Sequence, residues 1–347
     1  MAVSTIDPNG LNIGQIGGTR NLIINGAMVI DQRNSGAAIS SLGQYTTYTL
    51  DRWQYYSDQA AKFSFQQNQS SVTPPVGFTK YLGLTSLSAF SPATNETVTI
   101  SQHVEGFNSA KLGWGTSDAR TVSLSFWVRS SLTGTFSGAL IGGQNYIFTY
   151  SISSANTWEY KTITITGSTT GTWNTDNTSG VRVLFTLGYG SGQVGTANAW
   201  QSADLAASGS VQVAGTSGAT FYLTGVQLEV GDTATPFEHR SYGDELARCM
   251  RYYISSRTNG TLSGSDVIFG RGESYLGWDY PVEMRATPTV TTANDASTGA
   301  GRYAVSSVNN YTDGDVDTNT SRHFRMRTPS TNSSYDTRLG YEADAEL

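Results

Sequence analysis

The sequence has a single cysteine, Cys249, and only four lysines among its 347 residues. One cysteine cannot form an internal disulfide, so apolar burial and strand pairing must hold the fold together. Lys and Arg number 21 against 27 Asp and Glu, and no basic run is present that could neutralise a phosphate backbone. We therefore expect a protein that does not bind nucleic acid.

Long apolar runs are also missing. No stretch approaches the roughly 20 apolar residues that a membrane span needs, so no membrane insertion is expected. Met1 to Thr5 lacks the basic and apolar regions of a secretory signal, and we expect synthesis in a cytoplasm and release by lysis. Charged residues are only 14% of the chain, so hydroxyl and amide groups must supply most of its solubility.

Clusters of metal-binding residues are not apparent in the sequence. The three histidines are far apart, at His103, His239 and His323. This spacing predicts no zinc site, and we expect no cofactor. The acidic stretch 313–317 resembles the start of a calcium loop but has Thr318 where that loop needs glycine and Phe324 where it needs glutamate. We interpret it as a solvated acidic turn, with an irregular calcium site as the alternative.

What the chain has in abundance is the pattern of short strands, because turn formers alternate with β-branched and aromatic residues. Thr121–Arg129 is the clearest case, with Val122, Leu124, Phe126 and Val128 on one face and polar residues with Trp127 on the other. Further strands are expected at 22–30, 48–56, 62–65, 97–104, 146–150, 162–166 and 181–187. About ten strands before residue 231 predict an all-β fold, a two-sheet jelly-roll sandwich.

The closing strand, 220–230, has a break in its alternation. Phe221 and Leu223 share one face of a regular strand, whereas Val226, Leu228 and Val230 share the other. One extra residue near Gly225 would turn both sets toward the core. We therefore predict a β-bulge at this glycine.

A helical pattern follows this strand. Ser241 precedes Asp244 by three residues, which is typical of a helix start. Leu246, Cys249, Met250 and Tyr253 then recur at helical spacing, so a helix of about three turns is expected from near Tyr242. Cys249 lies on its apolar side, where a buried, unreactive thiol is favoured.

The remaining residues predict a smaller β-domain. Its candidate strands are 266–269, 281–284, 289–292, 303–306 and 323–327. The apolar content is thin, which favours completion of the core by oligomerisation. The predicted organisation is a docking arm at 1–19, a jelly-roll domain at 20–238, a connecting helix at 239–256 and a C-terminal β-domain at 257–347.

Tryptophans are the candidate ligand-binding residues, because indole rings stack on the apolar faces of sugars. The weak candidates are Trp127, Trp114, Trp158, Trp173 and Trp200. For each one, packing in the core or in an interface is the favoured alternative. Carboxylates that could cleave a glycan include Asp51, Glu96, Glu105, Asp118 and Glu159, but nothing in the sequence singles out a pair. We expect no catalytic residues.

Three blocks, Asn21–Arg33, Tyr48–Trp53 and Gly225–Tyr253, resemble tail-fibre and related virion-surface proteins of tailed bacteriophages. In order and spacing the resemblance spans about two thirds of the chain, and 281–290 is similar to the segment that follows in such proteins. The blocks resemble scaffold rather than ligand site. For Asp51–Trp53, a buried ion-pair corner is favoured over a sugar site.

The resemblance implies a jelly-roll domain similar to carbohydrate-binding modules, carried on a virion surface and usually trimeric. The expected function is a non-enzymatic tail fibre or adhesin that binds a bacterial surface glycan and docks on another virion protein through residues 1–19. A tail location is favoured over the capsid. A capsid or tail decoration without glycan binding, such as a head fibre, and a polysaccharide depolymerase are the alternatives.

Overall fold

A computed structural model describes residues 20–255, 274–293, 302–305, 312–313, 315–328, 337–338 and 340–347. The chain divides into two compact units: the first is Met1–Met28, Ser40–Thr47 and Gln54–His239, and the second is Val29–Ile39, Tyr48–Trp53 and Arg240–Leu347. The predicted arm at 1–19 and the predicted strand at 266–269 lie outside the described residues. The domain boundaries drawn from the sequence stay predictions, and the assignment of 29–39 and 48–53 to the second unit was not among them.

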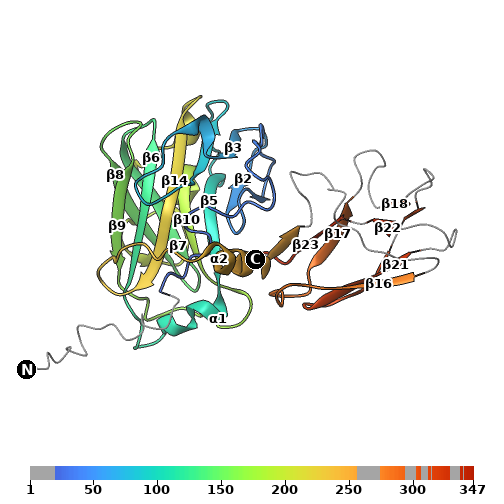
Figure 1. The fold of residues 1–347 in the computed structure, drawn as a ribbon. Helices are drawn as coiled ribbons and strands as arrows, with labels where there is room; N and C mark the ends of the chain where they lie inside the picture. Colours follow the sequence, from blue (N-terminus) through green and yellow to red (C-terminus); the bar gives the residue numbers. More distant parts are fainter. Residues whose placement is uncertain are drawn as a thin grey trace, which may run out of the picture. The chain divides into compact units, whose positions relative to one another are not determined.

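The first unit consists of two sheets packed face to face, which confirms the predicted two-sheet sandwich (Figure 1). One sheet has the order β1-β2-β5-β10-β7-β8-β12, formed by Thr47–Tyr48, Gln54–Ser57, Thr97–Glu105, Ser179–Tyr189, Gly134–Ile141, Asn145–Ile152 and Trp200–Gln201. The other has the order β3-β4-β14-β6-β9, formed by Phe63–Gln67, Leu82–Ser86, Thr220–Val230, Val122–Ser130 and Glu159–Ile165. A small parallel pair joins β11 (Val194–Gly195) to β13 (Ala206–Ala207).

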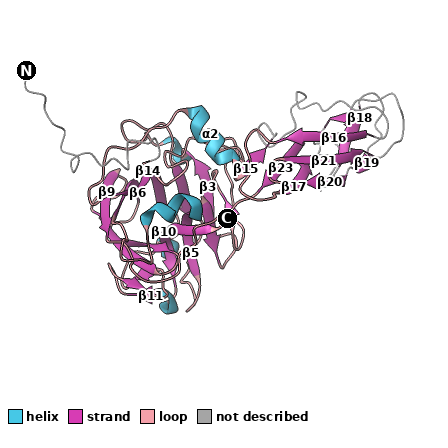
Figure 2. Cartoon of the chain, turned by 90° about the horizontal axis from the view of Figure 1, so that it is seen from below, coloured by secondary structure: helices cyan, strands magenta, loops and turns pink. Residues whose placement is uncertain are grey.

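Alternating apolar residues of both sheets fill the space between them. Phe126 of β6 meets Phe185 of β10 edge to face, with ring centroids 4.9 Å apart, and both side chains are fully buried. Helical elements are few among the described residues of this unit (Figure 2). They are α1 (Gly106–Ser109) and the single-turn elements η2 (Gln69–Ser71), η3 (Ala110–Leu112), η4 (Ser191–Gln193) and η5 (Val213–Gly215).

The predicted bulge in β14 is confirmed. Thr224 is opposite Trp127 of β6, but Gln227 is opposite Ser125, so β14 has one extra residue at this point. Gly225 adopts a φ of 63°, a left-handed conformation that glycine adopts without steric cost. The bulge turns Phe221 and Leu223 before it, and Val226 and Leu228 after it, toward the same core, where all four are fully buried.

The strand expected at 22–30 is wrong. The segment is buried but irregular, because Asn25 and Met28 have positive φ values that a strand cannot accommodate. The side chain of Gln102 takes the place of a neighbouring strand: its amide donates to the carbonyl of Ile24 (2.7 Å) and its oxygen accepts from the N–H of Ile24 (2.8 Å). A buried irregular segment can therefore have the same apolar composition as a central strand, and composition alone does not distinguish the two.

The strand expected at 48–56 is also interrupted. A turn lies between β1 and β2, in which the N–H of Trp53 donates to the carbonyl of Leu50 (2.9 Å) and Arg52 has a φ of 72°. Left-handed Arg52 ends the strand because an extended ladder cannot continue through it. The strands β4 and β7, which carry glycines inside their apolar pattern, were not predicted from the sequence.

The last and longest segment of the second unit begins with α2 (Tyr242–Met250), near the predicted position. Ser241 caps it, because its hydroxyl accepts from the N–H of Asp244 (3.2 Å). Tyr253 was expected on this helix but begins β15 (Tyr253–Ser255), since the helix ends at Met250. Burial raises the pKa of the Cys249 thiol well above its usual value, so this cysteine is protonated at neutral pH and is a poor nucleophile.

Three small sheets complete the described part of this unit. Their orders are β15-β23-β17, β16-β21-β20 and β19-β18-β22. The strands not yet defined are β16 (Ser274–Asp279), β17 (Thr289–Ala293), β18 (Arg302–Val305), β19 (Thr312–Asp313), β20 (Asp315–Asn319), β21 (His323–Thr328), β22 (Thr337–Arg338) and β23 (Gly340–Asp344). Strands were predicted at the positions of β17, β18 and β21, whereas β16, β20 and β23 were missed.

The strand expected at 281–284 is not formed. Pro281 has no N–H to donate to a ladder, and the N–H of Met284 donates instead to the carbonyl of Ser321 (2.7 Å). Met284 nevertheless belongs to the core of this unit, with Ile254, Tyr280, Phe324 and Tyr341. The apolar pattern at 281–284 therefore indicates that Met284 is buried, but it does not indicate a strand.

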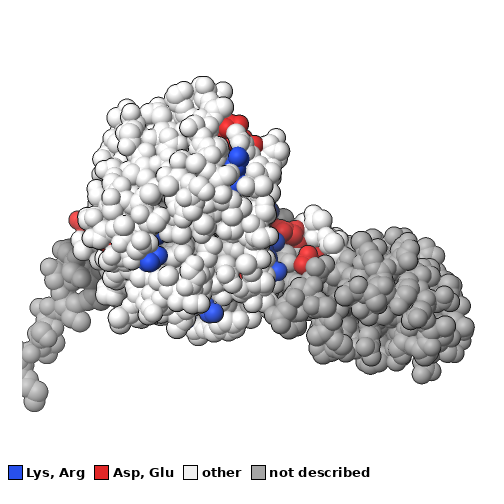
Figure 3. Space-filling view, turned by 90° about the horizontal axis from the view of Figure 1, so that it is seen from above, with Lys and Arg blue, Asp and Glu red and all other residues white. Residues whose placement is uncertain are grey.

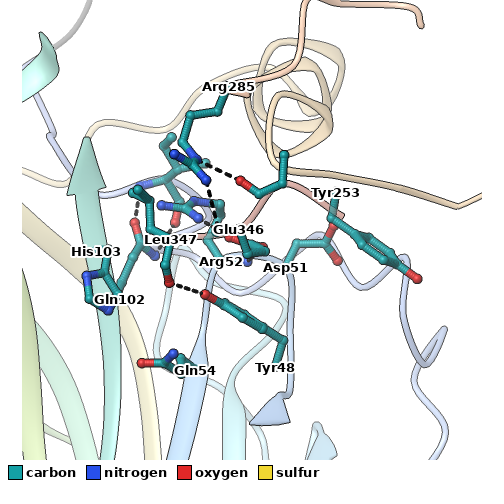
Figure 4. A network of polar contacts seen from close by, with 12 residues as sticks. Tyr48, Asp51, Arg52, Gln54, Gln102, His103, Tyr253, Arg285, Glu346 and Leu347 are labelled. Atoms are coloured by element: carbon teal, nitrogen blue, oxygen red, sulfur yellow. Dashed lines mark hydrogen bonds and ion pairs between the residues drawn. The ribbon is translucent and has the colours of Figure 1, made fainter. Parts of the chain in front are cut away.

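The block Asp51–Trp53 is buried, as the ion-pair interpretation predicts, and Figure 4 shows Asp51 and Arg52 near Glu346. Arg52 pairs with Glu346, and its guanidinium lies 3.5 Å from the ring centroid of Tyr252. Asp51 instead accepts hydrogen bonds from the backbone and side-chain N–H groups of Gln32 at 2.7 and 2.5 Å. Burial raises the pKa of Asp51 to about 6, although these hydrogen bonds lower it.

The final residues of the chain are held in the same network (Figure 4). Arg33 lies within 3.3 Å of the carboxylates of Asp344 and Glu346. Arg285 donates to the carbonyls of Ala345 (2.7 Å) and Glu346 (3.0 Å). Residues 344–347 thus supply the counter-charges and acceptors for arginines that lie far away in the sequence.

Candidate functional site

Three of the five predicted tryptophans gather in one cluster of the first unit. The rings of Trp114, Trp173 and Trp200 meet edge to face, with centroids 4.9, 5.3 and 5.6 Å apart. Each indole N–H donates to a backbone carbonyl at 2.7, 3.0 and 2.8 Å, and the acceptors are Arg120, Thr170 and Thr166 respectively. These indoles therefore fasten loops to the sandwich, and their N–H groups are already used.

Trp158 has a similar structural contact. Its half-buried ring packs against Tyr81, with centroids 5.4 Å apart, and its indole N–H donates to the carbonyl of Thr73 (2.9 Å). Tyr81 is fully buried beneath it. Trp158 thus holds the loop that contains Thr73 over the outer face of the five-stranded sheet.

Trp127 differs from the other four. Its neighbours Phe126 and Val128 face the core, so Trp127 lies on the outer face of the five-stranded sheet and is half-buried. Its ring lies 5.3 Å from that of Tyr160, its cross-strand partner on β9. Within the described part of the chain, no atom accepts a hydrogen bond from its indole N–H.

A groove of about 480 Å³ opens at Trp127. Its lining includes Val76, Phe78, Trp127, Tyr160, Phe237 and His239. The backbone of the Gly225 bulge and residues 234–236 also line it, and none of the described lining residues is Lys, Arg, Asp or Glu. Its volume lies within the range of about 300–1,000 Å³ that is usual for small-molecule sites.

The β14 bulge makes room for this groove. A Cβ atom on Gly225 would lie 2.7 Å from the ring of Phe78 and 3.1 Å from Cδ1 of Trp127. Real Cβ atoms essentially never approach another atom below 3.0 Å, so a larger residue would displace at least Phe78. The glycine that turns β14 toward the core therefore also lets two aromatic rings approach its outer face.

Three of the rings that line the groove contact one another. Phe78, Phe237 and His239 are mutually in contact, with centroids 5.1, 5.3 and 4.9 Å apart. Neither imidazole nitrogen of His239 has a hydrogen-bond partner among the described residues, and the same is true of the Tyr160 hydroxyl, which belongs to a side chain that is 43% exposed. The groove thus has an apolar lining with three unused polar groups.

Phe237 and His239 are carried by residues 231–239, which we call the strap. Glu229, a fully buried residue of β14, fixes its centre by accepting from the N–H (2.8 Å) and hydroxyl (2.6 Å) of Thr235. Gln227 and Arg20 also contact this carboxylate, at 2.8 and 3.4 Å. A buried charge needs such partners, so Glu229 is well suited to set the position of the strap.

The end of the strap is fixed separately. The N–H of Glu238 donates to the side-chain oxygen of Gln227 (2.8 Å). The Glu238 carboxylate in turn accepts from the backbone N–H groups of Arg20 (3.1 Å) and Asn21 (2.8 Å). These contacts explain why the strap and the 20–28 segment, which are distant in sequence, both lie beside β14.

The sequence identified Trp127 as a candidate and missed its neighbours in the groove. Tyr160 is separated from Trp127 by more than thirty positions, and only the pairing of β6 with β9 brings them together. Phe237 and His239 lie in a block that was interpreted as scaffold. The available signal was the 236–239 run, in which aromatic and polar residues alternate a few positions after the end of β14.

The candidate catalytic carboxylates do not line the groove. Glu159 pairs with Lys161 at 2.6 Å, and Asp51, Glu96, Glu105 and Asp118 are likewise not among the lining residues of the groove.

No cluster of three or more metal-binding side chains occurs in the described residues. No described helix is long and apolar enough to span a membrane. Figure 3 shows one face of the first unit, on which charged residues are isolated among uncharged ones.

No protein-family model matches the sequence. No curated protein matches it either. Solved structures with a similar arrangement include the enzymatically active domain of tailspike protein 4 of bacteriophage CBA120, with 12% identity and a TM-score of 0.31. That match covers 61% of this chain and only 21% of the tailspike chain.

Carbohydrate-binding modules are also among the similar structures. TmCBM61 in complex with β-1,4-galactotriose has 10% identity and a TM-score of 0.31, over 61% of this chain and 100% of the module. The family 11 module from Clostridium thermocellum, in complex with a mixed-linked tetrasaccharide, has 14% identity and a TM-score of 0.27, over 57% and 99%. At such identities, ligand and activity must be inferred from this chain's own residues.

Proposed function

We propose that this protein is a non-enzymatic glycan-binding component of the virion surface of a tailed bacteriophage, and that the groove at Trp127 is its glycan site. The observation that carries the glycan-binding part is the free indole N–H of Trp127 in an open aromatic groove. The virion part rests on the resemblance of the three sequence blocks to tail-fibre proteins.

The groove has the two kinds of contact that a sugar ring needs. The apolar C–H face of the sugar can stack on the Trp127 ring. The hydroxyls of the sugar can form hydrogen bonds with the indole N–H, the Tyr160 hydroxyl and the His239 imidazole. None of these groups must break an existing hydrogen bond with a described residue in order to bind a ligand. Ligand sites of this kind combine an apolar lining with a few convergent polar groups.

Binding without cleavage is favoured because the described lining of the groove contains no carboxylate, whereas glycoside hydrolysis usually needs a pair of them. A single open site of this size predicts weak affinity. Assembly into a homotrimer, and many copies on one particle, would raise the avidity by orders of magnitude without any new contact.

The test is binding of the purified protein to an array of bacterial surface polysaccharides, with the variant Trp127→Ala. We expect the affinity to fall at least about tenfold, as for the loss of a binding hot spot. Phe107→Ala is the matched control, because Phe107 is 61% exposed and lies outside the groove lining.

Retention of wild-type binding by Trp127→Ala would contradict the site. Absence of binding to any host glycan would favour a decoration protein. Release of reducing ends from a bound polysaccharide would show a depolymerase, so the same material should be assayed for it.

A further inference from the structure

We propose that the groove selects neutral pyranose sugars over acidic ones. This inference rests on the proposed function, and it concerns the chemical class of the ligand. Among the residues that the structure describes, no Lys or Arg lines the groove, and the free polar side-chain groups are those of Trp127, Tyr160 and His239.

Arginines near the groove are already engaged. Arg20 contacts Glu229 (3.4 Å) and donates to the carbonyl of Pro236 (2.6 Å). Arg129 lies two residues from Trp127 on β6 and therefore on the same side of the sheet. Its Nε donates to the carbonyl of Asn156 (3.0 Å), and its guanidinium lies 5.3 Å from the ring centroid of Tyr222. Arg129 is thus held against the sheet, away from the lining residues of the groove.

A uronic acid would meet a physical penalty in this groove. Stacking its ring on Trp127 would remove water from its carboxylate, and no Lys or Arg among the described lining residues would replace that water. A neutral hexopyranose keeps the same stacking face, and its hydroxymethyl group can be hydrogen-bonded by neutral donors. The groove therefore favours neutral sugars over acidic ones, because only the acidic sugar loses the hydration of a charged group when it binds.

The experiment uses the full-length protein and pairs of methyl glycosides that differ only at C6: glucoside against glucuronide, galactoside against galacturonide and mannoside against mannuronide. Ligand-detected NMR measures each affinity, with Trp127→Ala to show that the signal comes from the groove. We expect at least one neutral member to bind at least about tenfold more tightly than its acid. We also expect its affinity to change little between about 50 mM and about 500 mM salt, because uncharged contacts are not screened.

A designed reversal sharpens the test. Val76 lines the groove and is fully exposed, so Val76→Arg adds a cation without opening a cavity in the core. The variant should shift the ratio of acid to neutral affinity by at least about tenfold toward the acid. Leu87→Arg is the control, because Leu87 is 42% exposed but does not line the groove.

Equal or tighter binding of an acidic member to the wild-type groove would overturn this inference and leave the proposed function intact. So would Trp127-dependent binding of acidic sugars alone. Absence of Trp127-dependent binding to every glycoside, and to the polysaccharides of the array, would overturn both. An unchanged ratio in Val76→Arg would show that charge at the groove does not govern selection.

Discussion

Two groups of aromatic residues in the first unit have the same residue types and opposite roles. In the cluster of Trp114, Trp173 and Trp200, every indole N–H is bonded to a loop carbonyl. In the groove, Trp127 and Tyr160 are in ring contact, but their polar groups have no partner among the described residues. A tryptophan whose indole N–H already donates to a loop carbonyl has a structural role. A tryptophan whose indole N–H has no partner is a candidate ligand-binding residue.

The largest expected effect tests the fastening role. Trp114→Ala removes a ring that is only 6% exposed and contacts two others. We expect the free energy of unfolding to fall by about 3–5 kcal/mol, the usual cost of deleting a buried large aromatic side chain. Urea denaturation followed by circular dichroism measures it, and a change below about 1 kcal/mol would remove the distinction between the two groups.

An intermediate loss of stability is expected at Gly225, on which both the bulge of β14 and the shape of the groove depend. Gly225→Ala places a side chain at a φ of 63° and against Phe78. The left-handed conformation should cost about 1–2 kcal/mol of stability, and the displaced ring should weaken glycan binding. Gly243→Ala is the control, because a Cβ atom there meets nothing within 4 Å. Unaltered binding by Gly225→Ala would show that the close approach of Phe78 is not needed.

The smallest effect on stability is expected at the groove itself. Trp127→Ala breaks no hydrogen bond of the indole and removes a half-buried ring. We expect a loss of no more than about 1 kcal/mol, small beside that of Trp114→Ala. The same denaturation measurement checks it. A loss of unfolding free energy as large as that of Trp114→Ala would mean that Trp127 also has a structural role.

The parts of the fold that were predicted correctly depend on local patterns. The break in alternation at Gly225 and the Ser241 cap are each visible within a few residues. The 22–30 segment was mistaken for a strand because its backbone is satisfied by the Gln102 side chain, about eighty positions away, and by single backbone bonds to β14. Apolar composition reports burial, but it does not say which groups satisfy the backbone.

The candidate site follows the same division. Alternation placed Trp127 on an outer face, but it could not show that the other four indoles donate to loop carbonyls. Phe78 and His239 come from loops whose positions depend on Gly225 and Glu229. The approach of Phe78 to Gly225 joins segments well over a hundred residues apart, and no periodicity encodes it.

The division of the second unit into three chain segments has a consequence for how such genes can change. Arg33 and Arg52 come from the first fifth of the chain, and Asp344 and Glu346 come from its last four residues. A recombination event at residues 239–240 would therefore give the early arginines a foreign C-terminus. Unless the incoming segment carried matching acids, the buried guanidinium of Arg52 and the half-buried one of Arg33 would lose their counter-charges. The early blocks and the C-terminal segment should accordingly be inherited together.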